Sequence, residues 1–338
     1  MIRGAETFCV NVWDDDEYHY AAAYGFMPKL HAYLHEDGQK RPFMLVVPGG
    51  GYCMVCNPEG ETVGEAFFEM GMNVAVLTYT TDITMSVPLR TQPAEDLSRA
   101  IRLIRANSER YRMDPEKLTV SGFSAGGHLC ATIATHYADV VDRKEELNRF
   151  SNRPDAVILG YPVITSGEFT HIYSIQALIG TEPSEEELTY YSLEKQVHKD
   201  MPPCFLWQTV TDNLVPIENT MLMAESLRKA GVPYAYYAFP RGWHGLSTAS
   251  ERMRKGDFGE PYTMEQLEPA IQAVKERRAV NVSEKRRTEL MMQFFGNPEG
   301  EKRESEEPPR PPMEMPAFDD VALWPRLAEV WLKDLQLL

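Results

Sequence analysis

Short apolar runs alternate along the chain with segments of helical period. The runs occupy residues 41–50, 72–79, 117–123, 155–162, 203–210 and 234–240 and are rich in aliphatic or aromatic side chains. Continuous apolar runs of this length are typical of interior parallel strands that are covered on both faces. Residues 27–36 instead alternate apolar and polar positions, which predicts a strand with a polar, solvated face that includes His31 and His35.

Helix-like segments lie between these runs. Residues 58–71 place Val63, Phe67 and Met70 on one face and end at Gly71, a residue suited to helix termination. Similar patterns predict the other core helices at residues 91–107, 125–137, 218–231 and 322–338. Strands that alternate with helices predict an α/β fold with a mostly parallel central sheet flanked by helices.

Two regions break the alternation. Residues 166–200 have helical patterns, and Ser184 and Glu187 have the spacing of a capping box, which together predict a small helical cap. Residues 248–320 form an insertion before the last helix, with helical patterns at 263–279 and 283–296 and a proline-rich connector at 300–316. We therefore expect one domain, residues 1–338, with two elaborations. The insertion serves either as a lid or oligomer contact or as a solvated surface addition.

Composition and charge limit the kinds of partner that we expect the chain to bind. The 338 residues are 43% hydrophobic, enough for a substantial core, and the formal net charge is −16. A negative long-range field repels polyanions, so we expect neither nucleic acid nor an anionic membrane surface as a partner. The N-terminus lacks a secretory pattern, no apolar run is long enough to span a bilayer, and five scattered cysteines fit reduced thiols, so we expect a cytoplasmic protein.

Two patterns invite a metal interpretation. Cys53 and Cys56 form a single C-x-x-C with no second pair, and His31 and His35 share the polar face of the predicted strand. A lone C-x-x-C is weaker support for a redox or metal site than for ordinary thiols, and two histidines on a strand face are more often solvated. We expect no metal and no organic cofactor.

A serine between glycines supplies the first chemical motif. Gly122, Phe123, Ser124, Ala125 and Gly126 fit G-x-S-x-G, after a predicted strand and at the start of a predicted helix. This context lifts a serine hydroxyl as a nucleophile, although a crowded turn alone would also require small residues. A second glycine cluster, Pro48 to Tyr52, follows the strand at 41–47. Alone it is a turn, but together with the serine motif it predicts backbone N–H groups that bind an oxyanion.

A nucleophilic serine requires a base and an orienting acid. His244 follows the predicted strand at 234–240 and lies between Gly242 and Gly245, and Asp212 follows the strand at 203–210. The order Ser124, Asp212, His244 is the order of a triad in α/β-hydrolases. His128 lies one turn into the helix after the serine, so we interpret it as a packing or hydrogen-bonding residue.

The segments PGGGY, GFSAGGHL, TDNLVP and WHGLS resemble those of the α/β-hydrolase superfamily. Within it, the chain is most similar to hormone-sensitive-lipase relatives and bacterial acetyl-xylan esterase-like carbohydrate esterases, over about residues 25–247 and the last helix. The resemblance implies an α/β-hydrolase fold and an oxyanion hole from the backbone of Gly50, Gly51 and Ala125. The family often has His at the position of Pro48, and this departure bears on how the glycine loop is braced.

These features predict a serine carboxylic-ester hydrolase that works through an acyl-enzyme. The resemblance favours small acyl groups, such as acetyl on a sugar or oligosaccharide. Aromatic residues near the site either stack on a sugar or belong to the core: Tyr52, Phe123, Tyr161, Trp207 and Trp243. A serine peptidase or acyl-amide hydrolase of the same fold, and a non-catalytic binding protein with this fold, are the alternatives.

Overall fold

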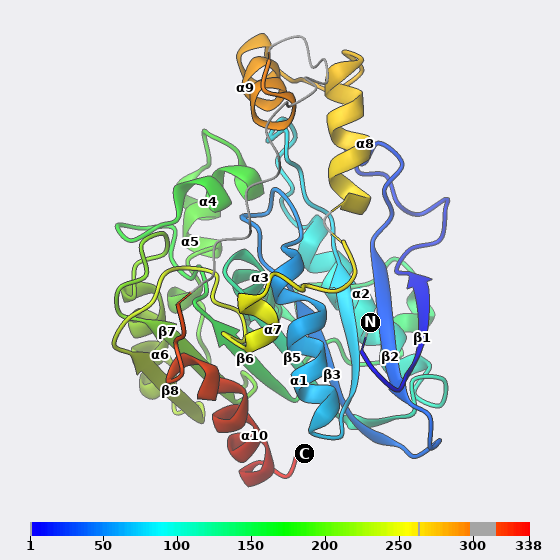
Figure 1. Ribbon diagram of the computed structural model, residues 1–338, viewed down its shortest axis with the longest axis vertical. Coiled ribbons are helices and arrows are strands. Elements are labelled where there is room, and N and C mark those ends of the chain that lie inside the picture. Colours follow the sequence, from blue (N-terminus) through cyan, green and yellow to red (C-terminus); the bar gives the residue numbers. More distant parts are fainter. Residues whose placement is uncertain (1, 263, 298–315) are drawn as a thin grey trace.

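A computed structural model describes residues 2–262, 264–297 and 316–338 (Figure 1). Its centre is an eight-stranded sheet in the order β1-β2-β4-β3-β5-β6-β7-β8, mostly parallel, in which β2 runs antiparallel to both of its neighbours. The strands are β1 (Ala5–Asn11), β2 (Lys29–His35), β3 (Arg41–Val47), β4 (Asn73–Thr78), β5 (Met113–Phe123), β6 (Ala156–Gly160), β7 (Cys204–Thr209) and β8 (Tyr234–Phe239). The predicted fold class is confirmed.

The core helices cover both faces of the sheet. They are α1 (Glu61–Glu69), α2 (Gln92–Ala106), α3 (Ala125–His136), α6 (Glu218–Ala230) and α10 (Trp324–Asp334). In Figure 1, α1 and α10 lie in front of the sheet, where the ring centroids of Phe67 and Trp324 are 6.0 Å apart. Helices α2 and α3 pack against one another, and α3 also contacts β5 and β6. Because both faces are covered, β4, β6 and β7 are buried along their whole length, as their apolar runs predict.

Strand β1 was not predicted from the sequence. It pairs antiparallel with β2 at the edge of the sheet, and all of its residues are partly buried or exposed. An edge strand of this kind needs few apolar residues, so it lacks the continuous run that marks the interior strands.

The predicted cap between β6 and β7 contains α4 (Ile172–Ile179), α5 (Glu185–Tyr190) and the 3-10 turn η3 (Leu193–Lys195). The capping box is present, since the Ser184 side chain accepts the Glu187 N–H and the Glu187 side chain accepts the Ser184 N–H. The remaining 3-10 turns are η1 (Asn57–Glu59), η2 (Glu145–Arg149) and η4 (Val321–Leu323).

The insertion contains α7 (Glu251–Arg254), α8 (Met264–Lys275) and α9 (Glu284–Phe295). Helices α8 and α9 form the lobe at the top of Figure 1. The lobe has its own small core, which packs on Ile83 and on the half-buried Cys53 and Met54. The predicted connector at 300–316 lies outside the described residues except for Pro316, and the division of the chain into one domain with two elaborations stays a prediction.

The polar face of β2 is not solvated as predicted, because the insertion covers part of it. The Tyr33 hydroxyl is hydrogen-bonded to the Tyr262 hydroxyl, and the two rings are buried. The His31 ring packs on Tyr262 with centroids 4.8 Å apart, and its Nε2 lies 3.6 Å from Glu265 Oε1. Alternation alone cannot tell a face that meets water from one that meets a polar neighbour.

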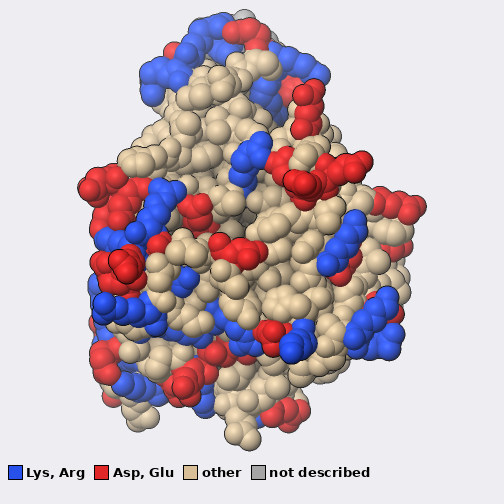
Figure 2. Space-filling model, turned by 180° about the vertical axis from the view of Figure 1, so that it is seen from behind, with Lys and Arg blue, Asp and Glu red and all other residues tan. Residues whose placement is uncertain are grey.

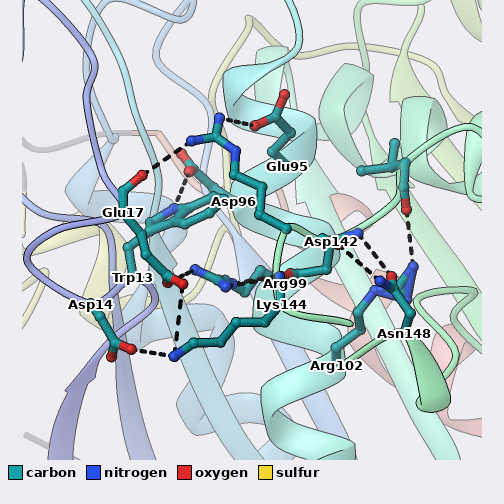
Figure 3. A network of polar contacts seen from close by, with 12 residues as sticks. Trp13, Asp14, Glu17, Glu95, Asp96, Arg99, Arg102, Asp142, Lys144 and Asn148 are labelled. Carbon is teal, nitrogen blue, oxygen red and sulfur yellow. Dashed lines mark hydrogen bonds and ion pairs between the residues drawn. The ribbon is translucent and has the colours of Figure 1, made fainter. Parts of the chain in front are cut away.

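A buried ion network ties the N-terminal segment to α2 (Figure 3). Arg99 donates to both carboxylate oxygens of Asp142, at 3.0 and 2.9 Å, and also to Glu17. Its guanidinium carbon lies 4.1 Å from the centroid of the Trp13 ring. The side chains of Arg99 and Asp142 are only 1% and 2% exposed, so neither charge is stabilised by water and each depends on the other.

The charge is spread over the surface. Figure 2 shows acidic and basic side chains intermixed over most of one face, with an uncharged, hollowed area below the α8–α9 lobe. Within the described ranges, none of the helices has both the length and the apolar character needed to cross a bilayer.

Candidate active site

Ser124 lies on a sharp turn between β5 and α3. Its φ and ψ are +53° and −119°, a conformation that L residues rarely adopt. Three backbone hydrogen bonds hold this geometry: the Ser124 N–H donates to Gly160 O, and the Ser124 carbonyl accepts from the N–H groups of His128 and Val163, each at 3.0 Å. A Cβ on Gly126 would lie 2.2 Å from the Val47 carbonyl oxygen. Only glycine fits there, which explains why the motif requires small residues.

The structure brings together the three residues predicted as a triad. Ser124 Oγ lies 2.8 Å from His244 Nε2, and His244 Nδ1 lies 2.8 Å from Asp212 Oδ2. The residues follow β5, β7 and β8, whose carboxyl ends meet at one edge of the sheet. The Asp212 side chain is fully buried and that of His244 is 12% exposed. The three side chains therefore converge as predicted, while their catalytic roles stay a prediction.

The contacts of His244 assign its proton. Because the Asp212 carboxylate can only accept, Nδ1 of His244 carries the hydrogen of this bond. Nε2 of the neutral ring then accepts the hydroxyl proton of Ser124. Asp212 is itself held by its other oxygen, which accepts the N–H groups of Leu214 at 2.9 Å and Val215 at 3.0 Å.

The glycine cluster passes close to Ser124. A Cβ on Gly49 would lie 2.8 Å from Ser124 Cβ, and Gly50 has a φ of +120° that a larger residue would not tolerate. Among the described residues, none accepts a hydrogen bond from the N–H of Gly50 or Gly51. The N–H of Ala125, the first residue of α3, has no acceptor within the helix. Within the described residues no backbone hydrogen bond occupies these three N–H groups, and their role in an oxyanion hole stays a prediction.

Two groups that sequence reasoning missed brace the glycine loop, in which position 48 is proline. The Glu59 carboxylate accepts the Gly49 N–H at 2.7 Å, and the Tyr79 hydroxyl donates to the Pro48 carbonyl at 2.8 Å. Glu59 is one acidic residue among many in the sequence, and Tyr79 lies directly after a buried strand. Neither has a local pattern that distinguishes it.

His128 forms a third brace, in agreement with its interpretation as a hydrogen-bonding residue. Its Nε2 lies 3.1 Å from the Tyr191 carbonyl, so Nε2 carries the proton. Its Nδ1 lies 2.8 Å from the Tyr52 hydroxyl and accepts from it. Burial lowers the pKa of His128 to about 4, so the ring is neutral at physiological pH.

Four of the five aromatic residues near the site are buried, which favours the core alternative over sugar stacking for them. Tyr52, Phe123 and Tyr161 are 1%, 0% and 2% exposed, so they support the site from beneath and offer no ring face to a ligand. Trp207 is also fully buried. Trp243 is half-buried, and its ring meets Phe318 edge-on with centroids 4.9 Å apart.

Exposed apolar residues lie instead in the segments that follow β6 and β7. Ile172 and Tyr173, in the first turn of α4, are 48% and 63% exposed. Val210 and Leu214, on either side of Asp212, are 50% and 49% exposed. We call these four residues the apolar rim. The sequence does not distinguish them from core residues, because exposure depends on neighbours that are distant in the chain.

His171 connects the cap to the site. Its Nδ1 lies 2.7 Å from Ser174 Oγ, and a Cβ on Gly51 would lie 3.8 Å from the same oxygen. Burial lowers the pKa of His171, and the neighbouring His244 also lowers it while the Asp212 carboxylate raises it. The beginning of α4 therefore lies against the glycine loop and near His244.

The cysteine pair has the character of ordinary thiols. Burial raises the pKa of Cys53 to about 12 and that of Cys56 well above its usual value, so both are protonated at neutral pH, unlike a redox pair. Throughout residues 2–262, 264–297 and 316–338, no three or more His, Cys, Asp or Glu side chains gather in a way that could hold a metal ion.

Comparison of the sequence with known families and proteins identifies relatives. The profile of the BD-FAE family matches residues 30–227. Endo-1,4-beta-xylanase B of Butyrivibrio fibrisolvens is 54% identical over 267 residues, which are 79% of this chain and 42% of that protein. The acetylxylan esterase of Xylanibacter ruminicola is 28% identical over 248 residues, 72% of this chain and 46% of that protein. The chain thus spans less than half the length of these two relatives.

Solved structures agree. The acetyl ester-xyloside bifunctional hydrolase from Caldicellulosiruptor lactoaceticus is 33% identical, with a TM-score of 0.68, 81% of this chain covered and 97% of that one. The carboxylesterase Cest-2923 from Lactobacillus plantarum is 22% identical, with a TM-score of 0.66 and coverage of 99% and 98%, a likeness that shows the fold alone. The predicted resemblance to acetyl-xylan esterase-like proteins is confirmed.

Proposed function

Because the chain belongs to the BD-FAE family, we propose that it is a serine carboxylic-ester hydrolase that removes small acyl groups, above all acetyl, from sugars or oligosaccharides. The observation that carries the proposal is the unbroken hydrogen-bond chain from Asp212 through His244 to Ser124, with 2.8 Å at each link. Such a chain activates a hydroxyl for attack on a carbonyl carbon.

In the first half-reaction, Ser124 Oγ attacks the ester carbonyl and His244 Nε2 takes the hydroxyl proton. Asp212 holds the other ring nitrogen and stabilises the imidazolium that forms. The carbonyl oxygen becomes an oxyanion that accepts hydrogen bonds from the N–H groups of Gly50, Gly51 and Ala125. The bond from the carbonyl carbon to the alcohol oxygen then breaks, and the alcohol leaves with the proton from His244.

In the second half-reaction, water attacks the acyl-enzyme. His244 takes a proton from the water, the same N–H groups stabilise the second oxyanion, and the bond between the acyl carbon and Ser124 Oγ breaks. The acid leaves, and Ser124 regains its proton from His244. In both half-reactions His244 is the group of the chain that takes up a proton and returns it.

The apolar rim supports a sugar on the alcohol side of the ester. The leaving oxygen must lie beside His244 to receive its proton, and Val210 and Leu214 flank the Asp212 that holds this imidazole. The exposed Tyr173 ring can pack against the C–H face of a sugar. The relatives named acetylxylan esterase and acetyl ester-xyloside hydrolase support acetylated sugars as the substrate class.

The relative named as a xylanase does not change this proposal. The match covers 42% of that protein, and a name describes the whole protein. Most glycoside hydrolases use two carboxyl groups on either side of the bond, about 5 to 10 Å apart. The serine and imidazole of this chain suit acyl transfer instead, so ester hydrolysis is the activity that we assign to the matched region.

The test is a substrate panel with wild type and Ser124→Ala. The substrates are p-nitrophenyl acetate, butyrate and octanoate, acetylated xylo-oligosaccharides, an aminoacyl anilide and an N-acyl amide. We expect acetyl esters to be turned over fastest and kcat to fall by about 10⁴-fold or more in Ser124→Ala. The exposed Ser151→Ala is the matched control and should leave the rate unchanged.

The outcomes separate the alternatives. Full activity of Ser124→Ala would refute the nucleophile. Faster cleavage of the anilide or the amide than of any ester would favour a peptidase or an amide hydrolase, and a preference for octanoate would favour a lipase. No turnover of any substrate by wild type would favour a binding protein.

A further inference from the structure

A buried carboxyl group lies behind the site and takes no part in the scheme above. Glu59, at the end of η1, is 2% exposed. Its Oε2 accepts the Gly49 N–H at 2.7 Å, and its Oε1 accepts the Tyr161 hydroxyl at 2.7 Å. Burying a carboxyl group is costly, and two short hydrogen bonds from different segments offset part of that cost.

The second of these segments leads to His244. The Tyr161 hydroxyl accepts the N–H of Ser247 at 3.0 Å, and Ser247 is three residues beyond His244 on the same loop. The Tyr161 ring also packs edge-on against the imidazole of His244, with centroids 4.9 Å apart. In addition, the Ser247 hydroxyl donates to the Pro58 carbonyl, next to Glu59. Glu59 is thus bonded to the glycine loop on one side and, through one tyrosine, to the His244 loop on the other.

We propose that Glu59 is a positioning residue that fixes the oxyanion donors relative to the base, by tying Gly49 and Tyr161 to one carboxylate. The proposal rests on the proposed function, because it assigns a role within the same site. It names Glu59 as a group that braces the glycine loop in a chain with proline at position 48.

The size of the expected fall in kcat follows from how precisely oxyanion donors must be placed. Oxyanion donors act at 2.7 to 3.1 Å, loss of one donor lowers kcat by about 10² to 10³, and a displacement of about 1 Å costs about 10²-fold. Because the oxyanion forms only during reaction, displaced donors lower kcat and leave KM nearly unchanged.

Two substitutions at position 59 differ in how many of the two hydrogen bonds they remove. In Glu59→Ala both donors lose their acceptor, so we expect kcat to fall about 10² to 10³-fold. In Glu59→Gln the amide oxygen can still accept the Gly49 N–H, while the amide NH₂ meets the Tyr161 hydroxyl, which is able to rotate. We expect a smaller fall, about tenfold, and a similar fall in Tyr161→Phe, which keeps the ring but loses the link.

The experiment measures kcat and KM for p-nitrophenyl acetate, and the inhibition constant of a trifluoromethyl ketone that forms an oxyanion with the serine. We expect KM to change less than threefold while the inhibition constant rises in proportion to the loss of kcat. Glu329→Gln, the same change at a largely buried glutamate on α10, is the matched control and should alter none of these values.

The result that overturns the inference is distinct from failure of the proposed function. If Ser124→Ala is inactive and wild type is active, while Glu59→Gln and Tyr161→Phe both keep wild-type kcat and inhibitor affinity, Glu59 has no positioning role. These two variants decide the question even where Glu59→Ala does not fold. A rise in KM with unchanged kcat would also overturn it, since that pattern indicates a substrate-binding role.

Discussion

Asp212→Asn tests the hydrogen-bond chain of the site by replacing one carboxylate oxygen with an NH₂ group. Asp212 Oδ1 accepts two backbone N–H groups, from Leu214 at 2.9 Å and Val215 at 3.0 Å, while Oδ2 faces Nδ1 of His244 at 2.8 Å. An asparagine side chain has only one accepting oxygen, and the two N–H groups place it at the Oδ1 position. The amide NH₂ is then directed at Nδ1 of His244.

This orientation reverses the direction of the bond. An NH₂ group that donates to Nδ1 forces the proton of the neutral imidazole onto Nε2, which can then no longer accept the Ser124 hydroxyl proton. The carboxylate that would stabilise the imidazolium is also lost. The corresponding change in a serine protease lowers kcat about 10⁴-fold, equivalent to about 5.5 kcal/mol of activation free energy. We expect the same order of loss here, with an intact fold because both loop bonds remain.

The assay is steady-state hydrolysis of p-nitrophenyl acetate by purified wild type and Asp212→Asn, with circular dichroism to verify folding. Asp200→Asn, the same change at an exposed position, is the control and should keep the wild-type rate. A folded Asp212→Asn variant whose kcat lies within tenfold of wild type would refute the role assigned to Asp212.

Three further changes probe the ion network, the rim and a buried acid. In Arg99→Met the buried Asp142 carboxylate loses its partner, so urea titration should show a loss of about 3 to 5 kcal/mol of unfolding free energy; a loss below about 1 kcal/mol contradicts this. Tyr173→Ala should raise KM for acetylated xylo-oligosaccharides about three- to tenfold and spare p-nitrophenyl acetate, whereas Tyr234→Ala, at the opposite end of the sheet, should change neither; an equal effect on both substrates would rule out a sugar contact. Burial raises the pKa of Asp96 from 3.8 to about 6, so the folded chain holds this proton more tightly and ionisation destabilises the fold. The unfolding free energy of wild type relative to Asp96→Asn should therefore decrease as pH rises through that interval, and a difference independent of pH would count against it.

The fold is predictable from the sequence because its interior strands are covered on both faces. Runs such as residues 72–79 and 203–210 have no alternative location for so many adjacent apolar side chains. Strand β1 was missed because a strand at a sheet edge needs few apolar residues. The face of β2 that carries His31 was misjudged because its cover, Tyr262, is more than 200 residues away in the chain.

The same distinction holds for the candidate site: positions at the ends of parallel strands were predictable, and contacts between distant segments were not. Convergence of Ser124, Asp212 and His244 was predictable because each follows its own parallel strand, and such strands end at one edge. The burial of the aromatic residues was not predictable, since the sequence does not distinguish the buried Tyr161 from the exposed Tyr173. Glu59 was missed for a further reason: its partners, the Gly49 amide and the Tyr161 hydroxyl, belong to separate strand ends.

The α8–α9 lobe cannot be removed without exposing residues next to the glycine loop. The lobe packs on Cys53 and Met54, and the amides of these two residues donate to the Gly50 carbonyl at 3.0 and 3.2 Å. Removing the two helices to shorten the protein would uncover residues that shape the backbone at Gly50. A shortened protein would therefore need new packing at this point. Under the proposed function, we expect a library that diversifies the lobe to change the rate of hydrolysis as well as solubility.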